Sequence, residues 1–340
     1  MKKKLASVGL LLVITALSAG AAPNTPGDES RVSYFVQPLL MKGLGGTAYD
    51  LSFPEGGGQS GLSRLEFPMA SLEAGITAGL SIEKNGQRAW LFEASIAHST
   101  IPWHANMNDY DWSGLSGYPP IPWSYTYSND TTTTFRASAE AAWTFGSIGP
   151  ISLSLYATYR YQYASHVEDT LTGWQYVAVT PATTPLQYVP YWFSDPTTDV
   201  LEYTLTAHEP GLGLMADLQI LNGLSLQLRA AFTAVYISDS DDHKLRTKLS
   251  TASGWGAGVY ANFRGKYQFP RYYKDFSTYI ALDGELISYY VSTVQTQYWY
   301  GTADSFADGT PIPAGTTQTG VGHVVTSTQF QLGLLFGFEF

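Results

Sequence analysis

Apolar and polar residues alternate with a period of two along much of this chain. In the segment 329–340 the even positions are apolar, while the odd positions, apart from Leu335, are polar or glycine. This is the pattern of a β-strand whose two faces meet different surroundings. The same alternation recurs in the segments 72–82, 224–234 and 254–264. The pattern predicts an all-β fold.

The connections between these segments indicate how many strands there are. Short turns are expected at 84–87, 146–150, 221–223 and 270–276, and the first and third contain Asn-Gly, a dipeptide typical of β-hairpins. Long polar loops are expected at 44–62, 102–123, 168–198, 239–250 and 301–320. Short turns at one end, long loops at the other and an even strand count are typical of bacterial membrane barrels. We therefore expect residues 22–340 to form a ten-stranded antiparallel transmembrane β-barrel with long extracellular loops.

One predicted strand changes its pattern near Ala70. Before this residue the apolar positions are odd-numbered, at Leu65, Phe67 and Met69; after it they are even-numbered, from Leu72 onward. A proline within a strand removes a ladder hydrogen bond and often accompanies an irregularity. We expect a β-bulge after Pro68.

Composition favours export to a membrane. Residues 1–21 begin with three lysines and continue with an apolar stretch and a small-residue cleavage site, which predicts a signal peptide. Aromatic residues make up 14% of the chain, as expected where Tyr and Trp ring the membrane interfaces. Without the signal peptide the formal net charge falls from −10 to −13. That charge disfavours nucleic acid as a partner and favours cationic ones.

Charged residues on the polar faces of the strands are expected to fill the barrel. Side chains largely occupy the interior of a barrel of this size. Their ion pairing argues against one alternative function, a small open pore. The residues with this parity are Arg229, Arg264, Glu66, Glu93, Asp283 and Glu285.

Two short acidic clusters lie where strands run into the long loops. Asp109 and Asp111 belong to the first, and Asp239, Asp241 and His243 belong to the second. Residues i and i+2 of a strand point the same way, about 6.5 Å apart. Asp241 is thus placed to orient His243 as a general base, and the Asp109–Asp111 pair to share a proton and position water. Acidic residues in outer loops are more often solvated surface groups, so the residues alone leave both interpretations open.

The order of the two motifs resembles the omptin family. Asp-x-Asp-Trp at the second outer loop is followed by Asp-x-Asp-x-His at the fourth, and the similarity is strongest at 106–112 and 238–243. Omptins are ten-stranded outer-membrane endopeptidases in which an Asp–Asp couple faces an Asp–His couple. The resemblance extends over the mature chain in length, strand count and loop placement. It implies an aspartic-type endopeptidase in the bacterial outer membrane, with its active site facing the cell exterior.

The resemblance also implies a role for each motif residue. Asp109 and Asp111 match the Asp–Asp couple, while Asp241 and His243 match the Asp–His couple. In the family mechanism His243, steadied by Asp241, would activate a water that attacks the scissile carbonyl without a covalent intermediate. Asp239 matches an acid that seats a basic P1 side chain. The expected partners are peptide or protein substrates, cationic ones in particular, and outer-membrane lipid.

Two details of the family pattern are incomplete in this chain. The second acid that would seat a basic P1 side chain falls near Thr47, so strict specificity for basic residues does not follow. Omptins bind lipopolysaccharide through tyrosine, acidic and basic residues on the outer wall. The corresponding stretch 159–163 reads Tyr-Arg-Tyr-Gln-Tyr, without an acid, which leaves a lipopolysaccharide requirement open.

No other cofactor and no metal is expected. The main rival is a non-catalytic adhesin or surface-binding barrel, which predicts dispersed rather than converging carboxylates.

Overall fold

The computed structural model describes residues 30–54, 60–84, 87–113, 122–179, 187–270, 276–305 and 310–340. The expected signal peptide lies outside these residues. No helix in this part of the chain has the length and apolar character needed to cross a membrane. The strands are β1 Ser30–Pro54, β2 Ser60–Pro68, β3 Ser71–Lys84, β4 Gln87–Ile101, β5 Trp103–Trp112, β6 Ser124–Ile148, β7 Ile151–Val179, β8 Gln187–Leu221, β9 Leu224–His243, β10 Lys248–Gln268, β11 Ser277–Trp299 and β12 Thr317–Glu339.

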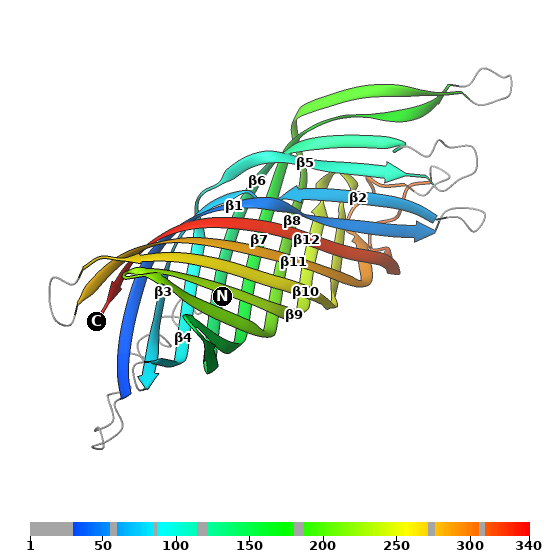
Figure 1. Cartoon of the computed structure of the whole chain (residues 1–340). Coiled ribbons are helices and arrows are strands. Elements are labelled where there is room, and N and C mark those ends of the chain that lie inside the picture. The colour runs from blue at the N-terminus through cyan, green and yellow to red at the C-terminus, as the bar shows by residue number, and fades with distance from the viewer. Residues whose placement is uncertain are drawn as a thin grey trace.

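The strands form one closed antiparallel sheet (Figure 1). Around one end of the barrel their order is β12-β11-β10-β9-β8-β7-β6-β4-β3-β1, and β1 pairs with β12 to close the ring. Around the other end β2 and β5 replace β3 and β4 between β1 and β6. We call the first the turn end and the second the β5 end. Each level of the barrel has ten strands, which confirms the predicted fold class.

The two fully described short turns agree with the sequence, whereas most of the expected long loops do not. Gly149 and Gly223 adopt φ of 57° and 81° in the turns after β6 and β8, a conformation that glycine reaches without strain. The other two short turns lie partly outside the described residues. Strands run into most of the expected loops, and only residues 244–247 separate β9 from β10. The expected loop 301–320 agrees with the structure, because β11 ends at Trp299 and β12 begins at Thr317. In Figure 1 the β7–β8 hairpin (green) extends furthest at the β5 end.

A band of outward-facing apolar side chains surrounds the barrel between two sets of aromatic residues. Tyr236 and Trp255 contact each other on the border toward the β5 end, with ring centroids 5.2 Å apart. Trp90 and Trp143 do so toward the turn end, at 6.3 Å. An apolar band between aromatic girdles is the surface that a membrane barrel presents to lipid. Members of the band include Leu40, Ile76, Ile96, Leu212, Phe232, Leu282, Leu332 and Leu334.

Beyond this band, toward the β5 end, the apolar residues turn inward. On β9 the outward Phe232 is 80% exposed, whereas Val235 and Ile237 are fully buried. They belong to a core that also contains Tyr49 and Tyr203. Here the outer wall meets water, so apolar residues gain by facing the interior. The barrel therefore continues beyond the lipid with a hydrophobic core of its own.

The same change of surroundings explains the pattern near Ala70. β2 and β3 pair with β1 in one unbroken register, and Phe67, Met69 and Ser71 are all buried. Odd positions thus point inward on both sides of Ala70. The predicted β-bulge after Pro68 is wrong: the register against β1 is unbroken, and the environment of each face changes there while the facing does not.

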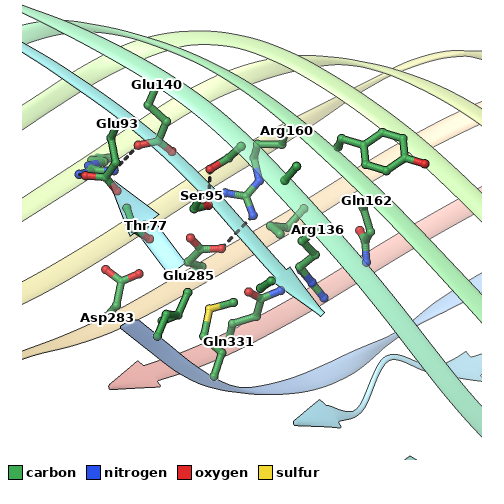
Figure 2. Close-up of a pocket in the computed structure, with 18 of the residues that line it drawn as sticks. Thr77, Glu93, Ser95, Arg136, Glu140, Arg160, Gln162, Asp283, Glu285 and Gln331 are labelled. Atoms are coloured by element: carbon green, nitrogen blue, oxygen red, sulfur yellow. Dashed lines mark hydrogen bonds and ion pairs between the residues drawn. The ribbon is translucent and has the colours of Figure 1, made fainter. Parts of the chain in front are cut away.

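Ion pairs fill the lumen within the lipid band (Figure 2). Arg264 lies 2.9 Å from both Glu93 and Asp283, and Arg229 lies 3.2 Å from Glu93. Arg160 pairs with Glu285 in the same layer. The prediction of a charge-filled interior is confirmed for the residues of this network. Glu66 was assigned to it wrongly, because on β2 it faces outward and pairs with Arg64.

Candidate active site

β5 carries Asp109 and Asp111 on its inward face. Met107, two residues earlier, is 2% exposed and belongs to the core. Tyr110 and Trp112 alternate with the two acids and stack on each other with centroids 5.8 Å apart. The side chains of both acids are partly exposed. Two carboxylates on one strand face are thereby presented at the β5 end.

β9 carries Asp239, Asp241 and His243 on its inward face. The buried core residue Ile237 precedes them with the same parity, while Asp242 points outward between them. This is the alternation that the sequence predicts for the strand. His243 lies about 23 Å along β9 from Tyr236 of the aromatic girdle, so the site stands outside the membrane-spanning part.

The two acidic pairs interact although their strands lie in separate walls. β6, β7 and β8 stand between β5 and β9 in the ring. Burial raises the pKa of Asp109 well above its ordinary value, and the charges of Asp111 and Asp241 raise it further, against the effects of Arg246 and Lys248. Coulombic effects of this kind require charges that are close together. Asp109, Asp111 and Asp241 are therefore near enough to one another to interact electrostatically.

Tyr49 of β1 donates a hydrogen bond to Oδ2 of Asp241. Burial raises the pKa of Asp241 to about 6, while Lys248 and the Tyr49 hydrogen bond oppose the rise. Among the described residues no hydrogen bond joins Asp241 to His243. Oδ1 of Asp241 and Nδ1 of His243 are both buried without a hydrogen-bond partner. Sequence reasoning missed Tyr49, whose only signal is an inward position on the first strand.

His243 is held in its neutral form. Burial lowers its pKa well below the ordinary value, and the positive charges of Arg246 and Lys248 lower it further. Arg246 lies in η2 (Lys244–Arg246), between β9 and β10. A neutral imidazole can accept a proton at physiological pH. Sequence reasoning missed both cations, because nothing distinguishes them from ordinary loop residues.

Asp239 is enclosed by protein contacts. Nε2 of His323 on β12 lies 2.7 Å from its Oδ2, and the hydroxyl of Tyr203 donates to the same oxygen at 3.3 Å. The backbone N–H of Ala252 donates to its Oδ1 at 3.1 Å. The Asp239 side chain is 2% exposed, and Thr47, at the position of the second P1-seating acid, is 1% exposed. The structure thus presents neither residue at the surface of the mouth.

The stretch matched to lipopolysaccharide binding is divided between the two faces of β7. Arg160 points into the lumen, where it lies 2.8 Å from Glu285 (Figure 2). Tyr159 and Tyr161 face outward, and the Tyr159 hydroxyl lies 2.7 Å from Nδ1 of His208. The outer wall keeps its tyrosines at this stretch but presents no basic residue there.

The fold is that of a ten-stranded membrane barrel, and acidic residues of β5 and β9 interact electrostatically at its β5 end. No family model matches the sequence, and no curated protein matches it. Among solved structures, the chain is similar to the outer membrane protease OmpT from Escherichia coli, with 14% identity and a TM-score of 0.68 over 95% of this chain and 100% of that chain. This confirms the omptin resemblance at the level of the fold. The translocator domain of the autotransporter NalP from Neisseria meningitidis also aligns, with 9% identity and a TM-score of only 0.31 over 97% of this chain and 95% of that domain.

Proposed function

We propose that this chain is an outer-membrane endopeptidase of the omptin type, with its site at the β5 end facing the cell exterior. The proposal is supported by the electrostatic interaction that links Asp109 and Asp111 of β5 to Asp241 of β9. A non-catalytic surface-binding barrel has no need to bring like charges together, because their repulsion is unfavourable. Perturbed carboxyl groups beside a neutral histidine are instead characteristic of catalytic sites.

The proposed reaction is a direct attack by water. Neutral His243 accepts a proton from a water molecule, whose oxygen then bonds to the scissile carbonyl carbon. Asp241, two residues away on the same face, stabilises the imidazolium that forms. The Asp109–Asp111 couple retains a proton and positions the water. Collapse of the tetrahedral intermediate breaks the C–N bond, and His243 returns the proton to the leaving amine.

Cationic peptides are the proposed substrates, but without strict selection of a basic P1 residue. The formal net charge of −13 after loss of residues 1–21 attracts cations at long range. Within the site, however, Arg246 and Lys248 offset part of the acidic charge, and hydrogen bonds engage both oxygens of Asp239. Attraction of the whole peptide and selection at P1 therefore have different physical origins here.

The direct test uses refolded barrel with a mixed library of basic and neutral fluorogenic peptides, with and without lipopolysaccharide. We expect cleavage by the wild type and a loss of about 10²-fold or more in kcat for Asp111→Ala. The outward Tyr110→Ala variant, one residue away, is the matched control and should stay active. No cleavage by a correctly folded wild type under any condition would favour the adhesin interpretation instead.

Tyr49→Phe should move the acid limb of the pH profile. The hydrogen bond from Tyr49 lowers the pKa of Asp241, so its removal raises that pKa above about 6. If activity needs ionised Asp241, kcat/KM then begins to fall at a higher pH than in the wild type. The phenylalanine keeps the ring contacts with Phe67 and Tyr203. Tyr203→Phe, which loses a bond to Asp239 instead, should leave the limb in place. An identical limb in wild type and Tyr49→Phe would contradict this role of Asp241.

A further inference from the structure

Lys248, the first residue of β10, lies directly opposite His243. The two are register partners across the β9–β10 pair, and Trp299 of β11 is the partner of Lys248 on its other side. Opposite residues of antiparallel strands project from the same face, with Cβ atoms about 4.5–5.5 Å apart. Lys248 is 6% exposed. Its side chain is therefore directed inward beside that of His243.

The ammonium group of Lys248 has no ion-pair partner among the described residues. Lys244, in the same turn, differs: it pairs with Asp242 and lies 3.8 Å from Glu202 at the outer surface. A buried charge without a partner is unfavourable for folding. Such groups are concentrated at functional sites, where they act on charge that forms during a reaction.

Lys248 interacts electrostatically with acidic residues of both β9 and β5. Burial, the largest influence, lowers the pKa of its ammonium, whereas Asp241 on the adjoining β9 and Asp109 on β5 both raise it. It is therefore near groups from both walls at once. Arg246 interacts with the same acids, but its side chain is exposed. Lys248 is thus the buried cation of the site.

We propose that Lys248 is a further catalytic residue of this endopeptidase, whose ammonium donates a hydrogen bond to the scissile carbonyl oxygen and stabilises the negative charge that forms there. The inference rests on the proposed function. When water attacks, its oxygen bonds to the carbonyl carbon, its proton passes to His243, and the carbonyl π electrons move to the oxygen. Lys248 keeps all its protons throughout. A preorganised cation in a site shielded from water acts more strongly on this charge than bulk solvent does.

The same charge has a second effect that can be measured without turnover. Lys248 lowers the pKa of His243, so its removal should raise that pKa. Because the other groups at the site stay unchanged in such a variant, a shift reports the charge of Lys248 itself. Those charged or titratable groups are Asp241 on β9, Arg246 in η2, Asp109 and Asp111 on β5, Tyr49 on β1, Glu168 on β7, Tyr203 on β8 and Asp304 after β11.

The test compares Lys248→Met and Lys248→Arg with Lys244→Met, the outward lysine of the same turn, in the refolded full chain. For Lys248→Met we expect kcat to fall about 10²- to 10³-fold with KM little changed, as for loss of an oxyanion donor. Lys248→Arg should recover part of this loss, and Lys244→Met should match the wild type. The pKa of His243, followed by NMR and assigned by comparison with His243→Ala, should rise in Lys248→Met alone.

The outcomes separate this inference from the function on which it rests. A folded wild type that cleaves nothing overturns both. An active wild type whose kcat is unchanged in Lys248→Met overturns the role of Lys248 and leaves the endopeptidase intact. A loss of kcat that Lys248→Arg does not relieve, with an unshifted pKa of His243, indicates a merely structural lysine and also overturns the proposal.

Discussion

Replacement of His243 by alanine is expected to lower kcat for peptide hydrolysis by about 10²- to 10⁴-fold, the usual contribution of a general base. The reason is the state of the imidazole: burial, Arg246 and Lys248 keep its pKa well below the ordinary value, so it is neutral and able to accept the proton of water. Single-turnover kinetics on a peptide that the wild type cleaves would measure the effect on the chemical step itself.

Asp242→Ala is the matched control for this experiment. Asp242 immediately precedes His243, but it points outward, accepts a hydrogen bond from Tyr300 at 2.8 Å and pairs with Lys244. Its loss should leave kcat close to the wild-type value. If His243→Ala were instead as active as Asp242→Ala, the base would have to be sought elsewhere in the chain.

Arg229→Ala is expected to destabilise the barrel by about 3–5 kcal/mol, because it leaves buried carboxylates without their counter-charge. The Arg229 side chain is 2% exposed and pairs with both Glu93 and Glu140. Glu93 retains Arg264, whereas Glu140 has no other ion pair among the described residues. Urea unfolding in micelles, followed by the gel mobility of folded and unfolded barrel, would report the free energy of unfolding.

Arg88→Ala shows what a less buried ion pair contributes. Arg88 pairs with Asp217 nearer the turn end, and the two side chains are 24% and 25% exposed. Solvent screening reduces such a pair to about 1 kcal/mol or less. Equal losses of stability in Arg229→Ala and Arg88→Ala would show that the lumen network is not the dominant polar contribution to the barrel.

Alternation along the chain was sufficient to predict the architecture, because a barrel strand must present opposite faces to lipid and lumen. It predicted the inward direction of Asp241 and His243 correctly, since no bulge interrupts β9. The alternation wrongly placed Glu66 in the lumen, and it predicted loops where several strands extend beyond the membrane. Both errors have one cause. Within the membrane the apolar face of each strand points outward, but beyond the lipid the polar face points outward, so the rule that apolar residues face outward fails there.

Much of the candidate site lay beyond any local pattern. The partner of Asp239 is His323, 84 positions away, and the donor to Asp241 is Tyr49, 192 positions away. Only closure of the ring brings these residues together. Lys248 follows its motif by a few positions, yet its significance depends on strand register, which places it opposite His243 rather than in the solvent.

The filled lumen has a consequence for where material can travel. Ion pairs occupy the barrel at the level of the lipid, and an aromatic core that includes Tyr49, Phe67 and Tyr203 lies between them and the mouth. A peptide that enters at the β5 end would meet both of these layers of described side chains before it reached the turn end. Under the proposed function and orientation, fragments produced there would leave by the way the substrate came, and the activity would alter the surroundings of the cell without feeding its periplasm.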